Sequence, residues 1–164
     1  MTGEYAISAP RQAVWDALND AGVLRDCLRG CDRLERISDT VFEMIITAKV
    51  GPVKTTLKGS LELSDLDPPN GYTISGRVTG GPTGHAKGDA NVRLIEKEGI
   101  TVLTYAVAAT LGGKLAQMGS RVINGVARGM ADDFFGRFAK RLNDSPDSSG
   151  VLSPENVNPG SAKD

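Results

Sequence analysis

Apolar residues recur at every second position in five segments between residues 32 and 111 of this chain. In the first of these segments, Phe42, Met44 and Ile46 share one face of an extended chain, whereas Glu43 lies on the other. Alternate side chains of a strand point to opposite faces, so each segment predicts a strand with one apolar and one polar face. Glycine- and proline-rich turns separate the segments. Short turns between one-sided strands predict an antiparallel sheet that is buried on one face.

The period changes after the last strand. From about Gly112 to Leu142, apolar residues recur three and four positions apart, as in an amphipathic helix: Leu115, Met118, Val122, Val126, Met130, Phe134 and Phe138. Some 30 helical residues would span about 45 Å at ~1.5 Å per residue. We therefore expect one long helix that covers the apolar face of the sheet.

Four glycines fall within this predicted helix: Gly119, Gly125, Gly129 and Gly136. Each interior glycine destabilises a helix by roughly 1 kcal/mol relative to alanine. We therefore predict a close backbone approach on the glycine side, either to the sheet or to a ligand.

The N-terminal part predicts a short strand and two short helices. Tyr5 and Ile7 alternate as in a strand, Pro10 suits a first helical turn, and Asp20 is placed to cap a second helix that Gly30 ends. With about six further strands and the long helix, this order predicts an α+β fold.

One domain accounts for residues 1–143 of the 164. Residues 144–164 are rich in Ser, Pro, Asn and Gly, and we predict a disordered polar tail there.

Composition excludes several classes of function. The formal net charge is −1, so the basic surface that nucleic-acid binding needs is not expected. No apolar run is long enough to cross a bilayer, and the N-terminus has no secretory pattern. Cys27 and Cys31 are interpreted as buried thiols of a cytosolic chain, although a disulfide between them stays possible. His85 is the only histidine, and no metal site is expected.

The predicted inner face of the sheet carries many small residues: Ala48, Gly59, Gly76, Ala86, Gly88, Ala90 and Ala109. Two interpretations stay open, a helix packed tightly on the sheet or an apolar cavity between them. In a cavity, Tyr72 and Tyr105 would supply polar groups.

No catalytic residue is predicted. His85 stands near no candidate nucleophile, and Asp132-Asp133 is better explained by ion pairs with arginines four residues away. The segment 80–88 is interpreted as a hairpin turn, since it lacks the Gly-Lys-Ser/Thr ending of a phosphate loop.

Basic residues follow one stripe of the predicted helix, where Lys114, Arg121 and Arg128 are seven apart. With Arg25, Arg29 and Arg33 near the predicted second helix they could form a basic rim that faces anionic lipid or an acidic partner; a solvated helix face is the alternative.

Three motifs stand at the beginning, middle and end of the predicted domain. They are the opening from Ala9-Pro10 through Val14-Trp15-Asp16-Ala17-Leu18 to Gly30-Cys31, the turn Val50-Gly51-Pro52-Val53-Lys54, and the stretch from Gly112-Gly113-Lys114 to Arg121 with Phe134-Phe135 downstream. Together they resemble CoxG, a family of carbon monoxide dehydrogenase subunits in the START-like, helix-grip superfamily, over about residues 5–142. Arg29 departs from the pattern, because the family often has proline before Gly-Cys.

The resemblance implies a helix-grip fold, in which a curved antiparallel sheet of six to seven strands clasps the long C-terminal helix around an apolar cavity. It also implies an accessory role beside a molybdenum hydroxylase of the carbon monoxide dehydrogenase type at the cytoplasmic membrane. The short polar tail argues against an anchor at the C-terminus.

From this resemblance we expect a non-catalytic cytoplasmic protein, peripheral at the inner membrane face, that holds a quinone or lipid and has no covalent cofactor. The expected cavity walls are Phe42, Met44, Ile46, Leu61, Tyr72, Ile74, Tyr105 and Val107 from the sheet, and Met118, Val122, Ile123 and Val126 from the helix. The expected membrane or partner rim is Arg25, Arg29, Lys114 and Arg121. Two alternatives stay open: a polyketide cyclase-like enzyme, and an interaction or maturation factor without a ligand.

Overall fold

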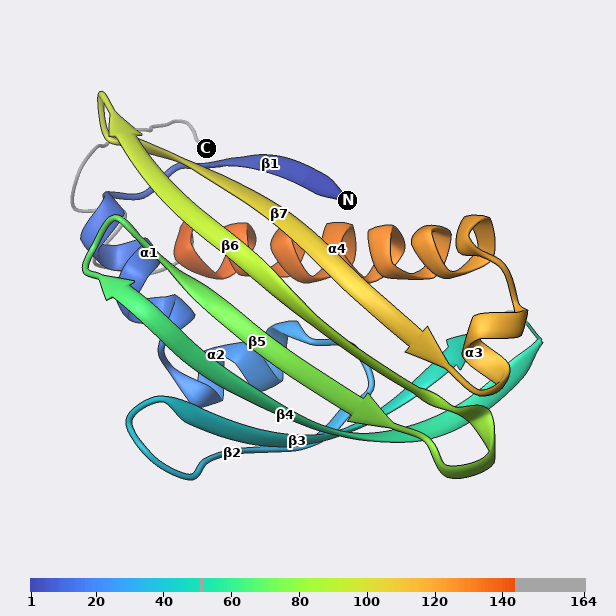
Figure 1. The fold of residues 1–164 in the computed structure, drawn as a ribbon. Helices are drawn as coiled ribbons and strands as arrows, with labels where there is room; N and C mark the ends of the chain where they lie inside the picture. The colour runs from blue at the N-terminus through green and yellow to red at the C-terminus, as the bar shows by residue number, and fades with distance from the viewer. Residues whose placement is uncertain (51, 144–164) are drawn as a thin grey trace.

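The fold is a seven-stranded antiparallel sheet that curves around a C-terminal helix (Figure 1). The computed structural model describes residues 1–50 and 52–143; Gly51 and the predicted tail, 144–164, lie outside the described residues. The elements are β1 (Thr2–Ile7), α1 (Arg11–Leu18), α2 (Ala21–Cys27), β2 (Cys31–Arg36), β3 (Val41–Val50), β4 (Val53–Asp67), β5 (Gly71–Thr79), the 3₁₀ helix η1 (Gly81–Thr83), β6 (His85–Lys97), β7 (Ile100–Gly112), α3 (Lys114–Gln117) and α4 (Ser120–Asn143).

The strands are ordered β1-β7-β6-β5-β4-β3-β2, and all neighbours are antiparallel. Sequential strands from β2 to β7 are joined by hairpins, and β1 adds to the edge next to β7. This arrangement confirms the α+β prediction and the helix-grip fold.

Period-two alternation produces the buried face as predicted. Phe42, Met44 and Ile46 of β3 are buried. Tyr72 of β5 and Leu103 of β7 are buried on the same face of the sheet. The predicted cap of α2 is present, since the Asp20 carboxylate accepts hydrogen bonds from the backbone N–H groups of Gly22 (2.9 Å) and Val23 (3.2 Å).

The predicted single helix from 112 to 142 is wrong at one point. Gly119 has φ +87°, a left-handed conformation that interrupts the helix and separates the one-turn α3 from α4. The apolar spacing of Leu115, Met118 and Val122 continues across the break, so the hydrophobic period gave no sign of it.

The core lies at one end of the sheet, where α1, α2 and the C-terminal half of α4 meet the strands (Figure 1). Phe138 of α4 has no exposed surface, and its ring lies 5.7 Å from that of Phe134. Near the other end of α4, Val122 is 42% exposed. Buried packing against the core therefore involves the C-terminal half of the helix, called here the anchored half.

Candidate ligand-binding cavity

An apolar cavity of about 160 Å³ lies inside the anchored end of the molecule. Its walls come from the inner face of the sheet, from α1, α2 and the loop that follows α2, and from α4. The lining residues are Leu18, Leu24, Leu28, Leu34, Phe42, Met44, Leu61, Leu63, Tyr72, Ile74, Val92, Leu103, Phe134 and Phe135.

Tyr72 is the one titratable side chain of this cavity wall. It is 4% exposed, and its ring lies 5.2 Å from the ring of Trp15. Burial raises the pKa of Tyr72 above its ordinary value, so the hydroxyl is a neutral donor at physiological pH. Within the described part of the chain, no hydrogen bond joins the Tyr72 hydroxyl to another group, although it is not among the fully buried side-chain atoms without a partner, which are Tyr105 Oη and Asp133 Oδ2.

A groove of about 490 Å³ adjoins the cavity, because Leu28 lines both. The groove lies between the N-terminal half of α4 and the end of β3. It is lined by Leu28, Arg29, Thr47, Ala48, Lys49, Gly125, Val126, Gly129, Met130 and Asp133.

The glycines of α4 make no close contact with the sheet, so that alternative of the prediction is wrong, and an approach to a ligand stays a prediction. A methyl group added at Gly125, Gly129 or Gly136 would meet no atom within 4 Å beyond the helix's own backbone. Gly125 and Gly129 instead lower the wall of the groove on the α4 side. A glycine can allow either close packing or an open space, and Gly125 and Gly129 leave an open space beside the groove.

Close approach occurs within the sheet instead. A methyl group added at Gly88 would lie 2.5 Å from the carbonyl oxygen of Ala108, and one at Gly76 would lie 2.9 Å from a methyl carbon of Leu61. Small residues on these strands therefore let neighbouring strands pack closely.

A cluster of aromatic rings fixes α4 against β1 and β7. The Phe135 ring stacks on that of Tyr5 at 4.5 Å, and the Tyr5 hydroxyl donates a hydrogen bond to the Asp132 carboxylate. Burial, and then the bond to Asp132, raise the pKa of Tyr5 above its ordinary value. The Tyr105 ring lies directly over Gly3, and its buried hydroxyl has no partner among the described residues.

The expected cavity residues separate into groups in the structure. Phe42, Met44, Leu61, Tyr72 and Ile74 line the cavity. Ile46 and Tyr105 are buried in the core and Val107 is half-buried against it, but these three do not line the cavity. On the helix side, Val126 lines the groove, Val122 is exposed, and Met118 and Ile123 are half-buried outside both spaces.

Residues that sequence reasoning missed supply much of the wall. Phe134 and Phe135 close the cavity from α4, and leucines of α1, of α2 and of the loop that follows it close it from the N-terminal side. The adjacent pair Phe134-Phe135 was the available signal, since two bulky rings at neighbouring helix positions cannot both face solvent at low cost.

The expected rim residues lie on different elements. Arg29, 74% exposed at its side chain, borders the groove with a guanidinium nitrogen 3.6 Å from the carboxylate of Asp133. Arg25 lies 3.8 Å from Asp26 on α2. Lys114 begins α3, and Arg121 stands exposed in the first turn of α4.

The structure also shows the state of the remaining metal-ligating and thiol side chains. Residues 1–50 and 52–143 hold no group of three His, Cys, Asp or Glu side chains arranged for a metal ion. Cys27 and Cys31 are free thiols whose pKa values are raised, chiefly by burial. In the same part of the chain, no helix combines the length and apolar character that spanning a bilayer requires.

Comparison with known proteins agrees with the fold. The family model for CoxG, described as a subunit of carbon monoxide dehydrogenase, matches residues 3–143. A solved structure of a conserved protein from Geobacillus kaustophilus is 30% identical in sequence with a TM-score of 0.80, over 85% of this chain and 92% of that chain. No curated protein matches the sequence.

Two structures of named enzymes are more distant. The Zhui aromatase/cyclase from Streptomyces sp. R1128 is 15% identical with a TM-score of 0.61, over 96% of this chain and 98% of that chain. Norcoclaurine synthase from Thalictrum flavum is 13% identical with a TM-score of 0.60, over 88% and 93%. At these identities the likeness concerns the fold alone.

Proposed function

The chain belongs to the CoxG family of carbon monoxide dehydrogenase subunits, and we propose that it is a non-catalytic accessory protein that binds a hydrophobic ligand in its interior. The proposed ligand is an isoprenoid quinone or a similar lipid. The proposed role is to connect a molybdenum hydroxylase of the carbon monoxide dehydrogenase type to the electron-transport chain at the cytoplasmic face of the membrane.

The observation that carries this proposal is the apolar cavity and the groove that adjoins it at Leu28. An apolar cavity of about 150 Å³ is large enough for a benzene-sized ring. At about 160 Å³ the cavity fits a ring of that size, while the groove has the volume of an ordinary ligand pocket. A ligand with a ring head and a flexible apolar tail matches the two spaces.

One polar group on the cavity wall suits such a ring. The Tyr72 hydroxyl is a neutral donor without a partner among the described residues, and a quinone carbonyl is an acceptor. A buried donor that lacks a partner is costly, so a ligand that accepts its hydrogen bond gains affinity from it.

The cavity wall supports binding better than acid–base catalysis. Among the described lining residues, Tyr72 alone can titrate, and burial moves its pKa away from the range that a general base needs. A cyclase-like reaction would require further polar groups that converge on the cavity.

The basic rim supports the proposed contact with a membrane or an enzyme. Arg29 and Lys49 border the groove, and Arg121 stands near the start of α4. Anionic lipid headgroups attract such residues by roughly 1 kcal/mol each near the surface.

Fluorescence offers a direct binding test, because Trp15 is the only tryptophan and its ring contacts that of Tyr72. We expect a menaquinone or ubiquinone analogue to quench Trp15 fluorescence saturably, and lipid extraction of the purified protein to release an apolar ligand. No quenching together with no extracted ligand would contradict the proposal and favour a factor without a ligand.

A matched pair of variants separates specific from general effects. Leu28→Phe narrows the junction of cavity and groove and should weaken quinone binding about tenfold or more. Leu66→Phe enlarges a side chain that is 44% exposed and lies outside the cavity, and should leave the affinity unchanged. Equal affinities for the two variants would place the ligand elsewhere.

A further inference from the structure

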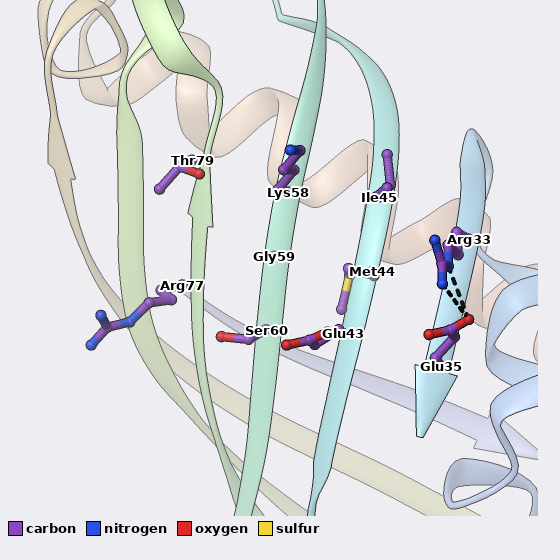
Figure 2. A pocket seen from close by; sticks show the side chains of 10 residues that line it. All are labelled: Arg33, Glu35, Glu43, Met44, Ile45, Lys58, Gly59, Ser60, Arg77 and Thr79. Atoms are coloured by element: carbon purple, nitrogen blue, oxygen red, sulfur yellow. Dashed lines mark hydrogen bonds and ion pairs between the residues drawn. The ribbon is translucent and has the colours of Figure 1, made fainter. Parts of the chain in front are cut away.

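The outer face of the sheet, opposite α4, carries a row of aligned charges across five strands. The row, called here the Ser60 row, runs from β2 to β6 through Glu35, Glu43, Ser60, Arg77 and Lys87, each paired in register with the next. Figure 2 shows its first four residues. The row places two acidic residues on one side of Ser60 and two basic residues on the other.

This arrangement sets like charges directly opposite one another within the chain. Glu35 lies opposite Glu43, and Arg77 lies opposite Lys87, and such pairs destabilise a sheet when nothing compensates them. Glu35 has an ion pair with Arg33 at 2.7 Å (Figure 2). Within the described residues, Glu43, Arg77 and Lys87 have no ion pair.

The sign of charge also reverses along β4. Lys58 precedes Ser60 by two residues and Glu62 follows it by two, so both side chains share the outer face with Ser60. Neither forms an ion pair among the described residues. The Ser60 row therefore places acidic and basic residues on opposite sides of β4, whereas Lys58 and Glu62 lie along β4 itself.

The surface around Ser60 is hollowed. One hollow of about 420 Å³ contains Glu35 and Glu43, and a second of about 560 Å³ contains Glu62 and Asp89. Ser60 and Arg77 line both. Long basic side chains from outside the molecule could therefore reach Glu43, which has no ion pair among the described residues.

We propose that this face binds a second copy of the chain around a two-fold axis that passes near Ser60, in the plane of the sheet and close to the direction of β4. Such an axis places β3 of one copy over β5 of the other. Glu43 then meets Arg77 of the second copy, Glu35 meets Lys87, and each contact occurs twice. Because β4 lies along the axis, Lys58 and Glu62 each face their own counterpart, and these two like-charge contacts oppose the four attractive ones and weaken the dimer. Face-to-face sheets pack about 10 Å apart with strands within about 30° of parallel, which long side chains can bridge.

The reversal of charge across Ser60 favours a second copy over an unrelated protein. A self-complementary patch is what a two-fold interface requires, because the same surface must act as both partners. A different protein could complement any pattern and would need no such reversal. This proposal rests on the outer face alone and does not depend on the proposed function.

The expected dimer is weak and sensitive to salt. Exposed ion pairs contribute about 0.2–1 kcal/mol each, and ionic strength screens them. We expect sedimentation velocity of the full chain to show a monomer–dimer equilibrium at low ionic strength that shifts to monomer as salt is added.

Charge exchange provides the decisive test. Glu43→Arg or Arg77→Glu alone replaces two attractive contacts by repulsive ones and should raise the dimer dissociation constant about tenfold or more. The double variant restores opposite charges across the axis and should recover the dimer. Lys97→Glu, in the β6–β7 hairpin, is the matched control and should dimerise like the wild type.

Far-ultraviolet circular dichroism of each variant checks that the fold is retained. A wild-type chain that stays monomeric at low salt and high protein concentration would overturn the proposal. A dimer that both single variants leave intact, or that the double variant fails to restore, would overturn it as well. Loss of hydroxylase binding in the single variants, with a monomeric wild type, would assign the face to the enzyme instead.

Discussion

Both halves of α4 are helical, but they differ in how closely their side chains pack against the rest of the domain. In residues 131–143, Phe134 and Phe135 close the cavity and Phe138 and Leu142 are buried in the core. In residues 120–130, Gly125 and Gly129 border an open groove, and Val122 is exposed. Buried packing holds one half. The other half is joined to its neighbours along the chain and to β1, where the Arg128 guanidinium donates a hydrogen bond to the carbonyl oxygen of Thr2 (2.8 Å).

The difference shows how one helix can close a core along one half and border an open groove along the other. The aromatic rings of the anchored half remove apolar surface from water and fix the position of the helix. The glycines of the open half leave the backbone bare beside the groove and give up helix stability in doing so. A ligand path at the glycine half is therefore compatible with a stable domain.

Truncation of the anchored half should give the largest effect. Phe138→Ala removes a side chain with no exposed surface and should lower the free energy of unfolding by about 3–5 kcal/mol. Val122→Ala in the open half should change it by less than about 0.5 kcal/mol. Urea denaturation measures both, and similar losses for the two variants would contradict the division of the helix.

The hydroxyl of Tyr5 should matter less, because its bond to Asp132 is near the surface. Tyr5→Phe should lower the free energy of unfolding by about 1.5 kcal/mol at neutral pH. The raised pKa of Tyr5 means that the folded state favours the protonated phenol. Its stabilisation is therefore complete below about pH 10, the ordinary tyrosine pKa, and is lost as the pH rises through the folded-state pKa.

Alkaline denaturation tests this assignment. The wild type should lose stability steeply above about pH 10, and Tyr5→Phe should reduce that slope. Tyr72, whose pKa burial also raises, should account for part of the remaining slope. An unchanged slope in Tyr5→Phe would show that Tyr5 is not held to the anchored half as described.

Alanine at the open glycines should give the smallest effect, with the opposite sign. Gly129→Ala should raise the free energy of unfolding by about 1 kcal/mol, because its methyl group meets nothing and favours the helix. Gly119→Ala should instead lower it by about 1–2 kcal/mol, because φ there is +87°. Destabilisation by Gly129→Ala would indicate a close contact at that position.

The sequence predicted the sheet well, because alternation of side chains reports directly which face is buried. Val41–Val50 is a strand over the full length of its pattern, and Asp20 caps α2 as expected. The break at Gly119 was not predicted, because the spacing of apolar residues shows which face of a helix is apolar. It carries no information on the backbone dihedral angle of a single residue.

The residues that line the cavity were harder to predict from the sequence than the fold. Residues of β3, β4 and β5 on its wall follow from alternation, but the part of α4 that faces them depends on where the helix crosses the sheet. Contacts of Phe135 with Tyr5 and of Phe138 with the core set that crossing, and both join residues far apart in the chain. The structure places Phe134 and Phe135 on the cavity wall, whereas the expected helix residues Val122 and Ile123 lie outside it.

Ligand occupancy of two leucine variants of α4 tests the account most directly. Gly129 lines the groove, whereas Gly136 lies in the anchored half outside both the groove and the cavity, and a methyl group at either position meets no atom within 4 Å beyond the helix's own backbone. The account predicts that Gly129→Leu loses most of its bound apolar ligand, measured by extraction and mass spectrometry, while Gly136→Leu keeps the wild-type amount. Full occupancy in Gly129→Leu would contradict a ligand path along the glycine half of the helix.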